Sequence, residues 1–455
     1  MKHSMRLSMA CCAIAALSAN TAMAQSSLKI YGNLDVAVTN VNKQRGHTAG
    51  TVFQASPLFT APSTVNSVVS SLSSQNALGF SGTEELGGGY KAGFILESQF
   101  ALDTGAQNGQ DGRMWGRQAF VSLTTPYGEV RMGRQYASMF YAFAMTTTES
   151  VGGSDIQATG MALNNLQIRQ DNLISYWLRS GGLMATISYS PNAGVAERVS
   201  STRSASVVPG ATGTGQTLSG LTAGTESTDG RGRTVGLMLG YTFPFGLLLA
   251  GAYNHTDFAG VPVGLGTATT VGGTTFYPNF FNAEKYTSFA FSGKYTVPGQ
   301  GTTISAQWHE GSMATSPTAA QGPLSAGLDL GDIKTRTFSV GVKQPIGDFA
   351  VGFQLAQAAF TNFTKGKSRA FMLAGDYNFS KRTKLYIRAG QMKDDRGDVV
   401  ATHAGSTPAS ALPLAGGPFN LKFGLGNVDS PFFSGGGSTM DARTNVVGIG
   451  IRHQF

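Results

Sequence analysis

Apolar and polar residues alternate along much of this chain. From Leu28 to Val36 the even positions are apolar or glycine and most odd positions are polar, and 370–379 alternates in the same way. Near the end of the chain, one face of such a pattern holds Val447, Ile449, Ile451, His453 and Phe455. Because successive side chains of a strand point to opposite faces, this period predicts strands with one face against an apolar medium and the other against water. No stretch has a convincing helical period.

Tight turns and longer loops follow each other along the chain. Seven turn signals occur at 86–88, 126–128, 180–182, 244–246, 298–300, 345–347 and 380–382. Between them lie polar stretches rich in Gly, Ser and Thr, such as 193–230, 259–282 and 396–440. Seven short turns and eight longer loops connect sixteen strands. The prediction is an all-β, 16-stranded antiparallel transmembrane β-barrel with short periplasmic turns and long extracellular loops.

Other architectures fit the sequence less well. A soluble sandwich of this length would have to divide into several domains, and no linker or shift in composition is present. A β-helix should have a short internal repeat, and none is apparent. The uncharged segment 234–254 could suggest a membrane helix, but Pro244-Phe245-Gly246 interrupts it, which favours a hairpin. A mean hydropathy of −0.04 also argues against several apolar helical spans.

The first 24 residues have the features of a secretory signal peptide. Lys2 and Arg6 precede an apolar run over 7–17, and Ala22-Met23-Ala24 supplies a small-x-small cleavage site. We expect cleavage after Ala24, which divides the chain into a signal peptide, 1–24, and a barrel domain, 25–455. Both cysteines leave with the signal, so no disulfide is expected. Without Lys2 and Arg6, 31 of the 33 basic residues remain against 25 acidic ones, and their scattered distribution predicts no binding of nucleic acid.

Five segments, in order, resemble those of the Gram-negative general porin family, the trimeric 16-stranded diffusion porins. They are LKIYG (28–32) followed by Asp35, LGFSGTEELG (78–87), GRQAFV (116–121) with GRQ (133–135), DYNFSKRT (376–383) and GIRHQF (450–455). The resemblance covers nearly the whole of 25–455. It implies a water-filled channel in the bacterial outer membrane for passive diffusion of ions and small hydrophilic solutes, with a third loop folded into the barrel.

The resemblance also implies a set of partners. These are two further copies of the chain in a homotrimer, outer-membrane lipids and lipopolysaccharide, and the barrel assembly machinery with periplasmic chaperones. The terminal Phe455 resembles the membrane-insertion signal that this machinery recognises, and it also suits the aromatic girdle of a barrel.

Alternation assigns two arginines to opposite faces of one predicted strand. In 129–136, Val130 and Met132 face outward, which turns Arg131 inward and Arg134 outward. An arginine against lipid at the bilayer midplane would cost about 2–4 kcal/mol. We therefore expect Arg134 near the rim or against a neighbouring subunit, and the resemblance implies a trimer contact.

Charged side chains facing the lumen set the field of a diffusion pore. By its motif, Arg117 resembles the pore arginine of the family, and Arg169 lies in the strand that leaves the third loop, which we place at 137–167. The expected constriction is formed by Arg117, Arg131, Arg169, Glu149 and Asp155. A basic wall facing an acidic loop would produce a transverse field across the pore. For the two acids, a position on the solvated rim is an equally simple interpretation.

Four departures from the family pattern remove positive charge. Ala77 stands where the family usually has arginine, Ser81 where it often has lysine, and Gln454 where the penultimate residue is often arginine. The segment Leu173-Ile174-Ser175 replaces the Ser-Ile-Arg that tends to follow the asparagine at 172. These changes predict a modest preference for anions, or none.

Catalysis is not predicted. The five histidines of 25–455 fit no zinc motif, there is no G-x-S-x-G nucleophile elbow, and neither a cofactor nor a metal is expected. Two other functions stay open. A substrate-specific channel should have an inward line of aromatic residues or a dense ladder of charges, and neither is evident. A barrel could also serve mainly adhesion through its long loops.

Overall fold

The computed structural model describes residues 27–43, 46–48, 59–60, 63–107, 113–148, 168–194, 232–264, 269–271, 274–276, 279–317, 332–361, 367–395, 439–440 and 443–455. The expected signal peptide, 1–24, lies outside the described residues.

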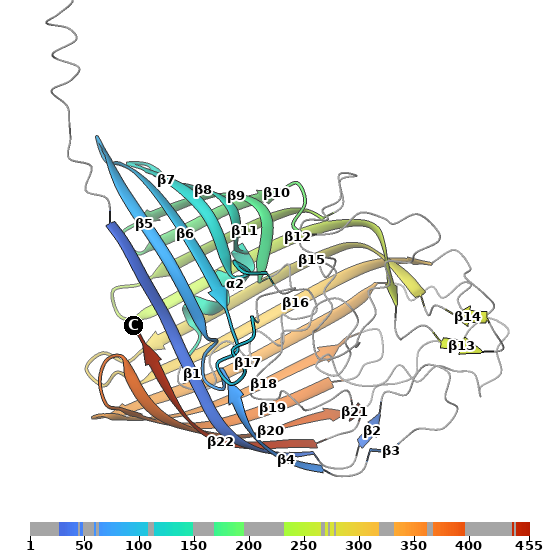
Figure 1. The fold of residues 1–455 in the computed structure, drawn as a ribbon. Helices are drawn as coiled ribbons and strands as arrows, with labels where there is room; N and C mark the ends of the chain where they lie inside the picture. Colours follow the sequence, from blue (N-terminus) through green and yellow to red (C-terminus); the bar gives the residue numbers. More distant parts are fainter. Residues whose placement is uncertain are drawn as a thin grey trace, which may run out of the picture.

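The described strands form a closed antiparallel wall (Figure 1). They are β1 (Ser27–Lys43), β4 (Ser63–Ser70), β5 (Ala77–Gly87), β6 (Tyr90–Gln99), β7 (Gln118–Thr125), β8 (Gly128–Tyr136), β9 (Arg169–Ser180), β10 (Leu183–Ser190), β11 (Arg233–Thr242), β12 (Leu247–Gly264), β15 (Asn279–Thr296), β16 (Thr303–Pro317), β17 (Ile333–Ile346), β18 (Phe349–Phe360), β19 (Lys367–Asn378), β20 (Thr383–Asp395) and β22 (Arg443–Gln454). Because β4 and β5 both pair with β1, they are two pieces of one barrel strand, and the 17 pieces make sixteen strands. The predicted barrel is confirmed.

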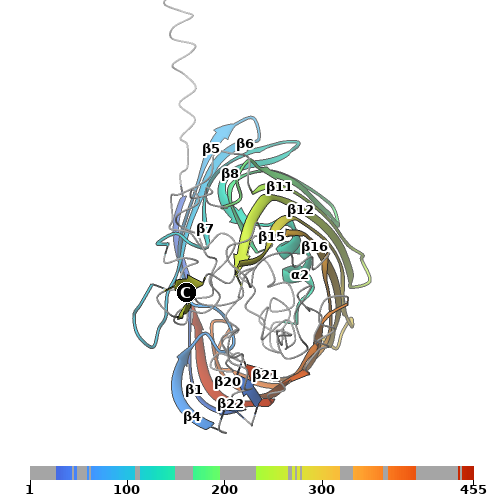
Figure 2. The ribbon, with the colours of Figure 1, turned by 90° about the vertical axis from the view of Figure 1, so that its right-hand side faces the viewer.

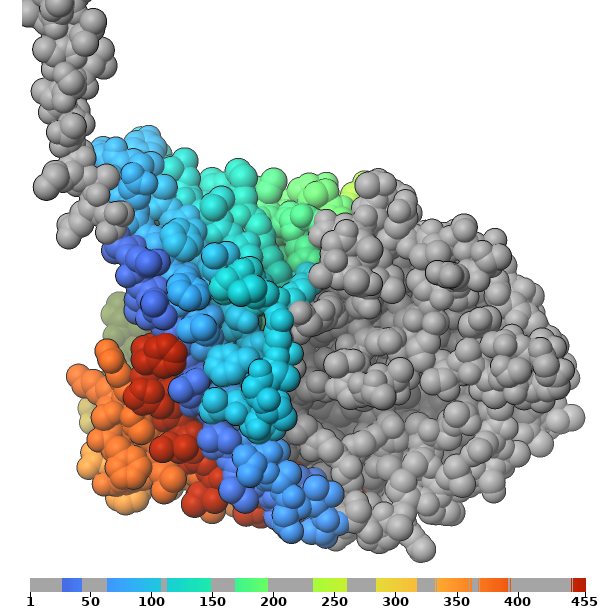
Figure 3. All heavy atoms as spheres, viewed as in Figure 1, coloured from blue at the N-terminus to red at the C-terminus, as the bar shows by residue number. Residues whose placement is uncertain are grey.

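The barrel closes where the two ends of the chain meet. Strand β1 pairs with β22 in a register that places Asn33 opposite Gln454 and Lys43 opposite Thr444. Figure 3 shows the blue N-terminal and red C-terminal strands side by side on the outer face. Closure leaves no free sheet edge, so the backbone groups of the wall are paired within the sheet.

The seven predicted turns all join neighbouring strands. They connect β5 to β6, β7 to β8, β9 to β10, β11 to β12, β15 to β16, β17 to β18 and β19 to β20. On the other rim, β2 (Gly46–Thr48), β3 (Phe59–Thr60) and β21 (Thr439–Met440) form a small sheet, and β13 (Thr269–Val271) pairs with β14 (Thr274–Phe276). The segment 234–254 is the hairpin β11–β12, as predicted. No helix among the described residues is long and apolar enough to cross a membrane.

The two faces of the wall differ in the way that alternation predicts. Large apolar side chains are exposed on the outward face, for example Ile30 at 56%, Val121 at 61% and Phe291 at 62%. Polar side chains such as Ser188 and Gln307 are buried on the inward face. An apolar outer surface suits lipid, and a polar inner surface suits a water-filled lumen.

A helix inside the barrel departs from the sequence prediction. Helix α2 (Ser138–Thr146) lies within the ring of strands against β11, β12 and β15 (Figure 2). Met139 and Phe143 pack on the wall, while Phe140 stacks on Tyr136 with 4.5 Å between ring centroids. Because apolar residues occupy both sides of the helix, it has no polar stripe and therefore no helical period in the sequence.

Candidate pore constriction

Helix α2 belongs to the expected third loop and is fastened to the inner wall at its C-terminal end. Ser292 Oγ donates to the Ala142 carbonyl at 2.7 Å. Gln307 Nε2 donates to the Phe143 carbonyl at 3.1 Å and to Thr146 Oγ1 at 2.8 Å. These carbonyls also accept from the Thr146 hydroxyl, and the Phe143 carbonyl accepts from the Thr147 amide, so the wall side chains add further hydrogen bonds that hold the helix in the barrel. The inward fold of this loop is confirmed for its described part.

A first set of polar side chains meets on the inner wall, and we name it the arginine cluster. Its members are Tyr31, Gln75, Glu97, Arg117, Tyr136 and Arg169. Arg117, just before β7, donates through Nη1 to Gln75 Oε1 and through Nη2 to the Tyr136 hydroxyl, each at 2.6 Å. Its Nε donates to Glu97 in β6. The Tyr31 hydroxyl donates to the other oxygen of Glu97 at 2.9 Å.

Arg169, the first residue of β9, joins the same cluster. Its Nη2 donates to the Tyr136 hydroxyl at 3.3 Å, and the guanidinium carbon lies 4.9 Å from the centre of the Tyr136 ring. A buried charge is tolerated when it is paired or hydrogen-bonded. The arginine cluster therefore holds two positive charges against the single negative charge of Glu97.

A second set lies on β1, β19, β20 and β22, and we name it the β20 cluster. Its members are Asp35, Asp376, Lys384, Tyr386, Arg388 and Arg452. Asp376 accepts from Lys384 Nζ at 2.9 Å and from Arg388 Nη1 at 2.8 Å. Arg388 is fully buried and lies 4.9 Å from the centre of the Tyr386 ring. Arg452 in β22 lies opposite Asp35 in the register. The set therefore contains three basic and two acidic residues, an excess of one positive charge.

Arg131 lies in a third environment. Its Nη2 is 2.8 Å from Glu129, and its guanidinium lies 4.7 Å from the Trp177 ring and 5.2 Å from the Phe120 ring. Burial raises the pKa of the nearby Tyr141 hydroxyl, on α2, to about 12, against the lowering effect of Arg131. Tyr141 is therefore neutral at ordinary pH and adds no negative charge to the lumen.

The structure brings together two of the five expected constriction residues. Arg117 and Arg169 share partners in the arginine cluster, whereas Arg131 pairs with Glu129. Glu149 and Asp155 lie outside the described residues, so their part in a constriction stays a prediction.

The acid that faces Arg117 among the described residues is Glu97, which the sequence interpretation missed. A signal for it was present, because Phe94 is exposed on the outer face of β6 and alternation then turns residue 97 inward. Nothing in the sequence pattern indicated Gln75, which lies between two strand pieces.

Arg134 lies on the other face of β8, opposite Ala119. Its Nε donates to the Gly116 carbonyl at 2.8 Å, and its Nη1 pairs with Asp171. Arg113 pairs with the other oxygen of Asp171 at 2.5 Å. Arg134 thus ties the segment before β7 to β9 within one chain, and its contact with a neighbouring subunit stays a prediction.

Fixed charges in this arrangement can attract counter-ions and orient water, which is the chemistry of ion selection rather than of bond making. Among the described residues, no group of three or more His, Cys, Asp or Glu side chains could hold a metal ion.

Comparisons with known proteins bear on the family and the fold of the chain. The sequence model of a family described as Gram-negative porin matches residues 10–397. Outer membrane porin protein 32 of Delftia acidovorans is 35% identical over 185 residues, which cover 39% of this chain and 48% of that protein. An outer membrane porin protein of Bordetella pertussis is 25% identical over 461 residues, which cover 99% of this chain and 100% of that protein. Among solved structures, the anion-selective porin from Comamonas acidovorans has a similar fold, with a TM-score of 0.59, 23% identity, and 95% of this chain and 100% of that chain covered.

Proposed function

The chain belongs to the Gram-negative porin family, and from this premise we propose that its pore has a modest preference for anions. The protein is an outer-membrane channel through which ions and small hydrophilic solutes diffuse passively. The proposal rests on one observation: each of the two inward clusters contains one more positive charge than negative charges. Charges of one sign in a narrow lumen raise the local concentration of counter-ions. Because each cluster also contains acids, the excess is small and the preference is modest.

The arginine cluster is the part of this proposal that we assign to the constriction. Arg117 and Arg169 supply its positive charge, and Arg131 lies beside α2 through Tyr141 and Trp177. We keep Glu149 and Asp155 as candidate acids of the third loop. The name of the Comamonas acidovorans protein points to the same ion preference, and for this chain that preference is a proposal.

The proposal is tested by the reversal potential across a planar bilayer that separates two salt concentrations. Arg117→Gln removes one inward charge, and we expect it to lower the ratio of anion to cation permeability. The matched control is Arg336→Gln, because Arg336 also pairs with a glutamate, Glu310, at 2.6 Å. Arg336 is two residues from the outward-facing Phe338 in the same strand, so its side chain is on the outer face and away from the lumen. Equal reversal potentials for the Arg117 variant and wild type would remove Arg117 from the narrowest part of the pore.

We further propose a homotrimer with one pore per subunit, formed after removal of residues 1–24. The resemblance to trimeric porins and the outward position of Arg134 support it. Conductance steps in groups of three, together with the mass of the protein in detergent, test the assembly. Mass spectrometry of protein extracted from outer membranes tests cleavage after Ala24. Membership of a family of channels supports a role without catalysis.

The same recordings separate the other functions. Block of the current by one solute at low concentration would favour a substrate-specific channel. Absence of any conductance in a folded preparation would favour adhesion through the loops.

A further inference from the structure

The second strand of the barrel is interrupted by the segment 71–76, which we name the inner ledge. The register places Ser70 opposite Val36 at the end of β4 and Ala77 opposite Asn33 at the start of β5. Only two residues of β1 lie between those partners, so the six residues of the ledge exceed a continuous strand by four. A β-bulge usually adds one residue. The ledge is therefore an element of its own.

The ledge is held against the inner face of the wall by Asp35, whose side chain is fully buried. The backbone amides of Ser73 and Ser74 donate to Asp35 Oδ2 at 3.2 and 2.8 Å. The Ser71 amide donates to the Asp35 carbonyl at 2.9 Å. From β20, the Tyr386 hydroxyl donates to Asp35 Oδ1 at 2.5 Å. One carboxylate thus anchors the ledge to two strands of the wall.

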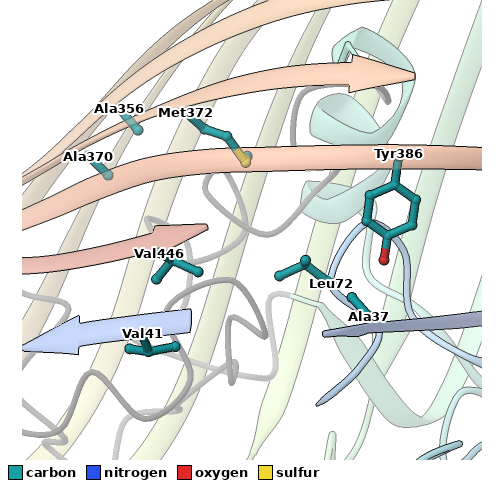
Figure 4. Packing of buried hydrophobic residues seen from close by; sticks show 8 residues of the cluster. All are labelled: Ala37, Val41, Leu72, Ala356, Ala370, Met372, Tyr386 and Val446. Carbon is teal, nitrogen blue, oxygen red and sulfur yellow. The ribbon is translucent and has the colours of Figure 1, made fainter. Parts of the chain in front are cut away.

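The wall also leaves space for the ledge. Leu72 is fully buried among Met372, Tyr386 and Val446, side chains of three other strands (Figure 4). A Cβ at Gly448 would lie 2.5 Å from Leu72 Cδ2, closer than non-bonded carbons can approach. The absence of a side chain at Gly448 therefore leaves the space that Leu72 occupies.

The exposed edge of the ledge faces the lumen beside the arginine cluster. Ser74 and Gln75 are its two partly exposed residues. Gln75 Oε1 accepts from Arg117 at 2.6 Å and from Arg169 at 3.4 Å. Helix α2 lies against β11, β12, β15 and β16, and Figure 2 shows it away from β1, β20 and β22. The ledge lies on that other part of the wall, against β1, β19, β20 and β22.

We propose that the inner ledge is a second constriction element, which narrows the lumen from the β1–β22 side and sets the size limit for uncharged solutes together with α2. Through Gln75 it also positions the two arginines of the arginine cluster. This inference rests on the channel activity but not on the proposed anion preference, because an uncharged solute senses only the width of the pore.

A deletion tests the ledge directly. Removing residues 72–75 joins Ser71 to Asn76, and these two residues then fall opposite Asp35 and Leu34 in an unbroken strand. We expect a larger single-channel conductance and several-fold faster swelling of liposomes in stachyose, a neutral tetrasaccharide. The matched variant Gln75→Ala keeps the ledge but loses the contact with the arginines. It should shift the reversal potential and speed the swelling by much less than the deletion does, because the backbone of the ledge stays in place. Wild-type conductance and swelling in the deletion variant would overturn the proposal.

A second experiment does not depend on a deletion that folds. Cys11 and Cys12 are the only cysteines of the sequence, so a barrel made from residues 25–455 has none. In Ser74→Cys, a bulky thiosulfonate reagent should reduce the single-channel conductance in a step that a reducing agent reverses. Tyr127→Cys is the control, because Tyr127 is 78% exposed in a turn of the rim and its modification should leave the current unchanged. If mass spectrometry shows complete modification at residue 74 and the conductance stays constant, the ledge does not narrow the pore.

Discussion

At the scale of single residues, the buried carboxylate of Asp35 is a point on which stability depends. It accepts two backbone amides and the Tyr386 hydroxyl, and Asp35→Ala leaves all three donors without this partner. We expect a loss of about 2–4 kcal/mol in the free energy of unfolding, because hydrogen bonds to a charged group are strong and unsatisfied buried donors are costly. Urea titration of the refolded barrel, followed by the gel mobility of unheated samples, measures the change. Asn40→Ala, which breaks an exposed hydrogen bond to Asn66, is the control and should change stability by less than about 0.5 kcal/mol. Equal losses in the two variants would contradict the role of Asp35.

Residue faces could be predicted from the sequence, but residue partners could not. Alternation placed Arg131 inward and Arg134 outward, and the register of β7 and β8 agrees. The partner of Arg117 was expected on the third loop, yet among the described residues it is Glu97 in β6, and two strands, β7 and β8, lie between it and the loop. The alternation of side chains along a strand predicts on which side of the wall a charge lies. The alternation does not say which inward-facing side chain of another strand a charged residue contacts, because that depends on the curvature of the barrel.

At the scale of elements, the fit of α2 in the lumen depends on hydrogen bonds from the wall. Gln307→Ala removes the donor to the Phe143 carbonyl and to Thr146 Oγ1. We expect the helix to be held less firmly, which should increase current noise and brief closures and lower stability by about 1–2 kcal/mol. The control Ser305→Ala lies two residues away on β16, and among the described residues its hydroxyl has no hydrogen-bond partner. Bilayer recordings as quiet as those of the control would show that Gln307 does not hold the helix.

The strands and turns were predictable as elements because each has a local signal, alternation or a Pro/Gly turn. Helix α2 and the inner ledge were not. Both lie inside the lumen, where the surroundings supply their partners: the helix is covered by apolar residues on both sides, and the ledge is held by Asp35 and by the space at Gly448. The contacts that define these elements come from strands far apart in the sequence, so no window of the sequence contains them.

At the scale of the whole molecule, closure joins the first strand to the last residue. The Gly32 amide donates to the Phe455 carbonyl at 3.1 Å, and the Phe455 amide donates to the Gly32 carbonyl at 3.2 Å. A Cβ at Gly32 would collide with the Phe455 ring, so the ring covers the backbone at the seam. The terminal residue therefore has a structural role in closure in addition to the insertion signal that its position predicts.

Refolding in detergent separates these two roles, because the assembly machinery is absent there. Deleting Phe455 removes two backbone hydrogen bonds from the seam, which should cost about 1–3 kcal/mol and lower the temperature at which the barrel unfolds on a gel by several degrees. Phe379→Ala is the matched control, since it removes an aromatic ring that is 62% exposed just after β19 and leaves the seam intact. If the shortened barrel unfolds at the temperature of the control and only its insertion in cells fails, Phe455 acts as a signal alone. A lower unfolding temperature for the purified, refolded protein requires that the last residue help to close the wall.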